Sequence, residues 1–134
     1  MDEPATGRHP AQAFPRSESS VALARRYTSQ TLGDIADLDA ALLVVSELTS
    51  NAVKYGAGEY FGLAFRIDAQ IRIDVSDDSP VLPATDESGP PPPDHPRGRG
   101  LLIVAALSAE WGTTRTATGK TVWAVLAPAP TGAS

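Results

Sequence analysis

A glutamate and an asparagine stand four residues apart near the middle of the chain, at Glu47 and Asn51. The residues around them have apolar side chains at a period near 3.6, which predicts an amphipathic helix that ends at Tyr55. On a helix, this spacing brings the two polar side chains onto one face in adjacent turns. A carboxylate and a carboxamide placed together can share a hydrated metal ion or orient a hydroxyl group. The alternative is that both residues belong to the solvated face of the helix.

An aspartate at the end of a predicted strand is the second candidate. Residues 70–76 alternate between polar and apolar side chains, as a half-buried strand does, and Asp77 follows directly. A carboxylate that points from a strand end into a pocket can accept a hydrogen bond from a ligand amine, such as the exocyclic amino group of adenine. The alternative is a surface aspartate that initiates a turn before Pro80.

Two glycines, Gly98 and Gly100, precede a predicted apolar helix that extends to Leu107. Glycines let the backbone approach a ligand closely, and the free N–H groups and dipole of a helix start favour a phosphate. Arg97 or Arg99 can add charge-assisted contacts. The alternative is a flexible hinge that ends the preceding loop. The sequence has neither a complete G-x-G-x-x-G fingerprint nor a G-x-x-x-x-G-K-[ST] phosphate loop.

The elements that must position these residues form two helices, two strands, a long loop, a third helix and two closing strands. The predicted helices cover about residues 17–32, 37–55 and 98–107, and the predicted strands cover 60–67, 70–76, 109–114 and 121–126, with a short edge strand at 11–14. Consecutive strand pairs with helices grouped between them predict an α+β two-layer sandwich. We expect a mixed, mainly antiparallel sheet with the helices on one face.

The overall composition fits one soluble domain. The chain has 134 residues, no apolar run long enough to span a bilayer, and no apolar region typical of a secretory signal in its first ten residues. The absence of cysteine excludes disulfides, thiolate metal sites and cysteine nucleophiles. The formal net charge of −5 argues against a general nucleic-acid binder. The two histidines lie in Pro-rich surroundings, which argues against a histidine metal site or a Ser-His-Asp triad.

In their order and gaps, the three candidate stretches resemble the GHKL ATPase superfamily, which includes gyrase, MutL and the catalytic domains of histidine kinases. Residues 46–56 (SELTSNAVKYG) resemble the N box of that family, residues 73–80 its first glycine box, and residues 98–104 (GRGLLIV) its second. Together with residues 110–112 and 119–123, they resemble more narrowly the small actinobacterial ATP-binding proteins akin to anti-sigma-factor serine/threonine kinases.

That resemblance implies the Bergerat ATP-binding fold, a histidine kinase-like ATPase domain, over residues 12–127. Flexible tails are then expected at 1–11 and 128–134, and the loop at 79–97 is expected to be the ATP lid.

The resemblance also implies a role for each candidate residue. Asn51 would coordinate the Mg²⁺ that bridges the phosphates of ATP, Glu47 would act as general base on the attacking hydroxyl, and Asp77 would hold the adenine amino group. Gly98 and Gly100 would let the lid and the helix start wrap the phosphates. The other implied nucleotide-binding residues are Lys54, Arg97, Arg99, Leu101 and Thr121.

The implied function is a cytoplasmic, ATP-binding regulator of transcription that resembles an anti-sigma factor with serine/threonine kinase activity. Its partners would be a sigma factor and/or an anti-anti-sigma protein of the STAS type, with no direct contact to nucleic acid or membrane; relatives often form homodimers.

A non-catalytic module of the same fold, which docks a partner with weak or no ATP turnover, is the alternative. The first glycine box favours it, because the family continues D-x-G-x-G whereas Asp77 is followed here by Asp78, Ser79, Pro80 and Val81, with no glycine. A detached histidine-kinase catalytic domain is a weaker interpretation, since the sequence predicts no long helical hairpin with a phosphoacceptor histidine.

Overall fold

The computed structural model describes residues 7–33, 37–80 and 98–127. These residues form five strands and three helices in the predicted order. The strands are β1 (Ala11–Pro15), β2 (Tyr60–Ile67), β3 (Ile71–Asp77), β4 (Ser108–Arg115) and β5 (Lys120–Leu126), and the helices are α1 (Ser19–Leu32), α2 (Leu38–Tyr55) and α3 (Gly98–Leu107). Within the described ranges, none of the helices has the length and apolar character needed to cross a membrane.

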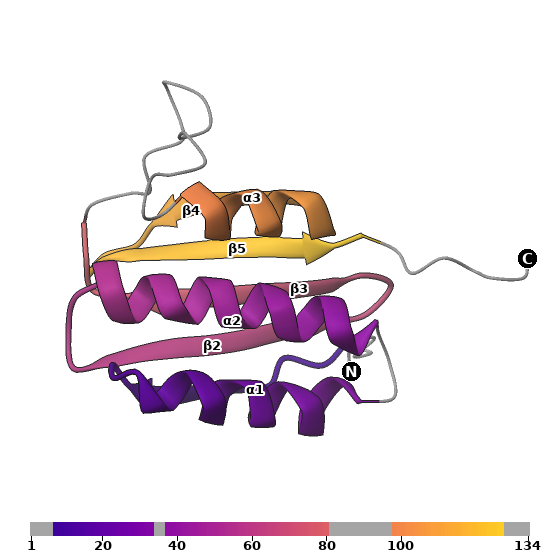
Figure 1. Cartoon of the computed structure of the whole chain (residues 1–134), viewed down its shortest axis with the longest axis horizontal. Helices are drawn as coiled ribbons and strands as arrows, with labels where there is room; N and C mark the ends of the chain where they lie inside the picture. The colour runs from indigo at the N-terminus through magenta and orange to yellow at the C-terminus, as the bar shows by residue number, and fades with distance from the viewer. Residues whose placement is uncertain (1–6, 34–36, 81–97, 128–134) are drawn as a thin grey trace, which may run out of the picture.

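The five strands form one sheet in the order β1-β2-β3-β5-β4, and each neighbouring pair is antiparallel. The three helices lie against one face of this sheet, with α2 between α1 and α3 (Figure 1). The predicted α+β two-layer sandwich is therefore confirmed. Because β5 enters the sheet between β3 and β4, the register of the β3–β5 pair places Lys120 opposite Asp77.

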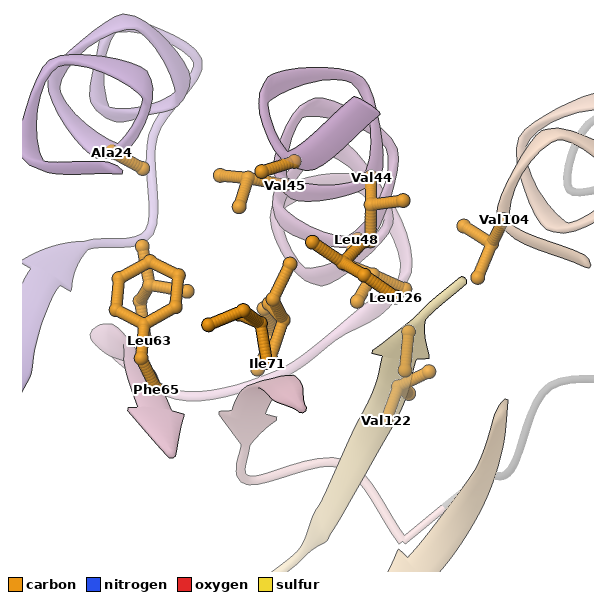
Figure 2. Close-up of a cluster of buried hydrophobic side chains, with 14 of the residues drawn as sticks. Ala24, Val44, Val45, Leu48, Leu63, Phe65, Ile71, Val104, Val122 and Leu126 are labelled. Carbon is orange, nitrogen blue, oxygen red and sulfur yellow. The ribbon is translucent and has the colours of Figure 1, made fainter. Parts of the chain in front are cut away.

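Helix α2 supplies the centre of the core. Its side chains Val44, Val45 and Leu48 are buried: Leu48 points toward the sheet, Val45 lies on the side of α1, and Val44 lies on the side of Val104 of α3 (Figure 2). Full burial of an aliphatic side chain stabilises a fold by roughly 1.5–3 kcal/mol. The apolar face thus fixes α2 on the sheet, and Glu47, outside this face, lies beside Gly100 of α3.

Both ends of α2 are defined by specific contacts. The carboxylate of Asp37 accepts a hydrogen bond from the N–H of Ala40 at 3.3 Å and so caps the first turn. At the other end, the N–H of Gly56 donates to the carbonyl of Ala52 at 3.0 Å. A Cβ atom at Gly56 would lie 2.7 Å from Cγ of Asp77. Glycine at this position therefore lets the end of β3 come close to the end of α2.

Candidate functional site

Four element ends meet at one end of the sandwich. The last turns of α2 and the end of β3 lie beside the start of β5 and the start of α3, on the left in Figure 1. Helix α2 packs against both α3 and β3. The three candidate stretches, which are far apart in the sequence, are therefore neighbours in the fold.

Glu47 lies against the first turn of α3. Its side chain is half-buried, and Gly100 is buried beside it. A Cβ atom at Gly100 would come within 2.7 Å of Oε1 of Glu47. The carboxylate of Glu47 fills the space that the missing side chain leaves, and the predicted approach of this glycine to a ligand stays a prediction.

Asn51, one turn further along α2, shares a hollow with Asp77. The hollow lies between α2, β3 and β5 and has a volume of about 20 Å³, which is room for about one water molecule. Its lining residues are Leu48, Asn51, Ala52, Tyr55, Val75, Asp77, Lys120 and Val122. The carboxamide on the helix and the aspartate at the strand end thus face one cavity.

The side chain of Asp77 is 2% exposed and forms an ion pair with Lys120, whose side chain is 6% exposed. Nζ of Lys120 lies 2.7 Å from Oδ2 and 2.9 Å from Oδ1 of Asp77. The backbone N–H of Ser79 donates to Oδ1 at 2.7 Å, and the N–H of Ala57 donates to the same oxygen at 3.4 Å. These donors hold the carboxylate of Asp77 at the end of the strand, where the sequence predicted it. The sequence did not predict that Lys120 forms an ion pair with this carboxylate.

Lys120 is the site residue that the sequence reasoning missed, and Thr121 is the one that it misplaced. Side chains alternate along β5, so Lys120 and Val122 face the helices whereas Thr121 faces the other side of the sheet. There the hydroxyl of Thr121 lies 2.7 Å from the hydroxyl of Ser76. The predicted nucleotide contact of the Thr121 side chain is thus corrected. The period-two pattern of β5, extended back by one residue, would have placed Lys120 on the inner face.

For three other predicted residues, the structure gives the position, and their nucleotide contacts stay predictions. Leu101 is buried in the first turn of α3, where it packs inward beside Gly100. Lys54 is exposed in the last turn of α2, three residues after Asn51. Gly98 is the first residue of α3, so the predicted helix start is confirmed.

The lid loop and its arginines are mostly outside the described residues. Of the predicted lid at 79–97, the structure describes Ser79 and Pro80. Arg97 and the side chain of Arg99 also lie outside the described part of the chain. Their predicted contacts with phosphates stay predictions.

The oxygen donors on α2 fit one kind of metal ion. Glu47 and Asn51 offer a carboxylate and a carboxamide from adjacent turns, and Mg²⁺ prefers oxygen ligands. Among the residues that the structure describes, no group of three or more His, Cys, Asp or Glu could hold a metal ion. This donor set therefore suits an ion that takes most of its ligands from water and phosphate oxygens, as Mg²⁺ does with nucleotides.

The chain belongs to the family of histidine kinase-like ATPase domains, whose model matches residues 14–126. Among solved structures, the chain is similar to the crystal structure of the RsbU and RsbW domains of Rv1364c from Mycobacterium tuberculosis, with a TM-score of 0.65 and 18% sequence identity. The similarity covers 89% of this chain and 31% of that one, and at this identity it shows the fold. The comparison with curated proteins finds no relative. The predicted resemblance to the GHKL superfamily is confirmed by the family match.

Proposed function

We propose that this domain binds Mg-ATP where α2, the end of β3 and the start of α3 meet, and that it transfers the γ-phosphoryl group to a serine or threonine of a protein partner. The observation that carries this proposal is the hollow that Asn51 and Asp77 share, with Glu47 one turn before Asn51 on α2 and Gly100 of α3 packed on Glu47. Membership in the family of histidine kinase-like ATPase domains supports ATP as the ligand.

In this proposal, the two polar residues of α2 divide the chemistry. Asn51 holds the metal ion, which when bound supplies charge neutralisation for the phosphates. Glu47, one turn earlier, accepts the proton of the attacking hydroxyl. Its half-buried position against Gly100 limits the orientations that its carboxylate can take, which favours a fixed base over a mobile surface glutamate.

The phosphates are assigned to the start of α3. The N–H groups in the first turn of a helix and its positive dipole end favour an anion at this position. From their places in the sequence, Arg97 and Arg99 are expected to add positive charge beside Gly98 and Gly100, and Lys54 is exposed in the last turn of α2. Leu101, which is buried, anchors this turn in the core.

We further propose a regulatory role, as an anti-sigma factor that acts on a STAS-type anti-anti-sigma protein and sequesters a sigma factor. The resemblance in the three boxes supports this role, and so does the similarity of fold to a structure that contains an RsbW domain.

Phosphoryl transfer tests the proposal directly. The protein is incubated with γ-labelled ATP, Mg²⁺ and a STAS-type protein encoded by the same genome, and label on serine is measured. We expect transfer by the wild type and a loss of at least about 100-fold in Glu47→Gln, because general-base catalysis contributes that much. Glu110→Gln, which removes an exposed carboxylate from β4, is the matched control and should transfer normally. Equal transfer by Glu47→Gln and the wild type would contradict the role of Glu47.

A non-catalytic binding module is the second candidate, and the Asp77–Lys120 ion pair favours it. In the described structure the carboxylate assigned to adenine already has a cationic partner. Calorimetry of the wild type with Mg-ATP separates the two candidates, since a protein that binds no nucleotide cannot be the kinase.

A further inference from the structure

Both oxygens of the buried Asp77 carboxylate already have donors inside the protein. Oδ1 receives contacts from Lys120, from the N–H of Ser79 and from the N–H of Ala57, whereas Oδ2 receives one contact, from Lys120 at 2.7 Å. An amino group of a nucleobase is also a donor, and the donor that it would meet at Oδ2 is the ammonium group of Lys120. The two N–H groups belong to backbone that is fixed by the turn after β3 and the end of α2, whereas Lys120 is a flexible side chain.

The hollow leaves no room for a base while Lys120 stays in it. Its volume of about 20 Å³ corresponds to about one water molecule. The apolar walls, which include Leu48, Ala52 and Val75, belong to the packed face of α2 and to the central strand β3. Lys120 is the lining side chain that can vacate space without opening the core, because its long stem can carry the ammonium group to solvent.

We propose that Lys120 is a built-in competitor of the nucleobase: its ammonium group occupies Asp77, and a nucleotide with an amino group on its base binds only by displacing it. This inference rests on the proposed function, because it assumes that the nucleotide uses the Asp77 hollow. Lys120 thereby lowers the affinity for nucleotides whose base carries an amino group, such as ATP. It is a specificity-determining residue rather than a catalytic one.

Calorimetry with two nucleotides tests the competition. Mg-ATP and Mg-ITP are titrated into the wild type, Lys120→Met and the double variant Asp77→Asn with Lys120→Met. ATP carries an amino group at position 6 of the base, and ITP carries a carbonyl oxygen there. We expect Lys120→Met to bind ATP at least tenfold more tightly than the wild type does, without a gain for ITP. The double variant should lose the gain for ATP. Arg66→Met, which removes a positive charge from an exposed position of β2, controls for net charge.

The outcomes separate this inference from the proposed function. If the wild type binds ATP and Lys120→Met binds it no more tightly, the competition is wrong and the proposed ATP site stands. An equal gain for ATP and ITP also overturns it, because a merely loosened pocket would not discriminate between the two bases. If neither protein binds either nucleotide at millimolar concentration, the proposed function and this inference are both wrong.

A second measurement uses the wild type and so does not depend on the folding of any variant. Lys54 and Lys120 are the two lysines of the sequence, one exposed and one buried. In protein labelled with ¹⁵N-lysine, the side-chain ammonium signal of Lys120 should be protected from exchange, and Lys54→Arg identifies it. We expect saturating Mg-ATP to shift or remove this signal. A Lys120 signal that stays unchanged at saturation overturns the proposal.

Discussion

Gly100 of α3 packs directly on the carboxylate of Glu47 of α2, so that a methyl group at Gly100 would come within 2.7 Å of Oε1. The contact joins the second glycine stretch of the sequence to the N-box helix. The contact explains why position 100 needs a glycine even without a ligand: a larger residue there would displace the side chain of Glu47.

Gly100→Ala should displace Glu47 with little effect on folding. The clash involves the far end of a flexible side chain, and alanine favours a helix over glycine by up to about 1 kcal/mol. We therefore expect the free energy of unfolding, measured with urea, to change by less than about 1 kcal/mol. Under the proposed function, phosphoryl transfer should fall at least tenfold, since misplacement by about 1 Å can reduce rates by as much as 100-fold. If Gly100→Ala lowers phosphoryl transfer by displacing Glu47, then adding Gly100→Ala to Glu47→Gln should cause no further loss of transfer.

Removing one partner of the Asp77–Lys120 pair should destabilise the fold more than removing both partners does. Lys120→Met leaves a carboxylate buried without its cation, a change that typically costs about 3–5 kcal/mol. Replacing both residues, with Asp77→Asn and Lys120→Met, removes the uncompensated charge and should recover a large part of that loss. Urea unfolding of the wild type, the single variants and the double variant measures the coupling. A double variant less stable than Lys120→Met would contradict this account of the pair.

The core face of α2 should be far more sensitive than its outer face to the same substitution. Leu48 is 2% exposed at the centre of the core, whereas Leu43 on the same helix is 41% exposed. Leu48→Ala should lower the free energy of unfolding by about 2–5 kcal/mol through lost burial and a new cavity. Leu43→Ala, the matched control, should change it by about 0.5 kcal/mol or less. Equal losses in the two variants would mean that α2 does not pack as described.

Stability at high pH should depend on Tyr27. Burial raises the pKa of Tyr27 above its ordinary value of 10.0, and a hydrogen bond with Thr31 opposes this to a smaller extent. The ring packs between those of Phe14 and Phe65. Because the folded-state pKa is the higher one, the contribution to stability is complete below pH 10.0 and is lost as the pH rises through the folded-state pKa.

Tyr27→Phe tests this dependence. Urea unfolding at about pH 9 and about pH 11 should show a smaller decrease in stability for Tyr27→Phe than for the wild type. Tyr60→Phe, at a position that is 57% exposed, should behave like the wild type. If Tyr27→Phe loses as much stability between the two pH values as the wild type does, groups other than Tyr27 cause the decrease.

Most of the secondary structure could be predicted because each element has its own local signal. The helix of Glu47 and Asn51 has a 3.6-residue apolar period, an aspartate cap at Asp37 and a glycine at its end. The strand before Asp77 alternates with period two. These signals depend only on neighbouring residues, so they can be read without knowing the rest of the fold. They placed Glu47 and Asn51 on one face of a helix and Asp77 at a strand end.

Which side chains line the hollow could not be predicted from any short stretch of the sequence. Whether Thr121 or Lys120 reaches Asp77 is decided by the register of β5 against β3, and a shift of one residue exchanges the two faces. The sequence determined that an amide, an acid and a glycine-opened helix are present, because residue type and period are local. Only the tertiary structure decided that a lysine from a distant strand neutralises Asp77 and that Gly100 seats Glu47, because strand register and helix packing bring together residues that are remote in the chain.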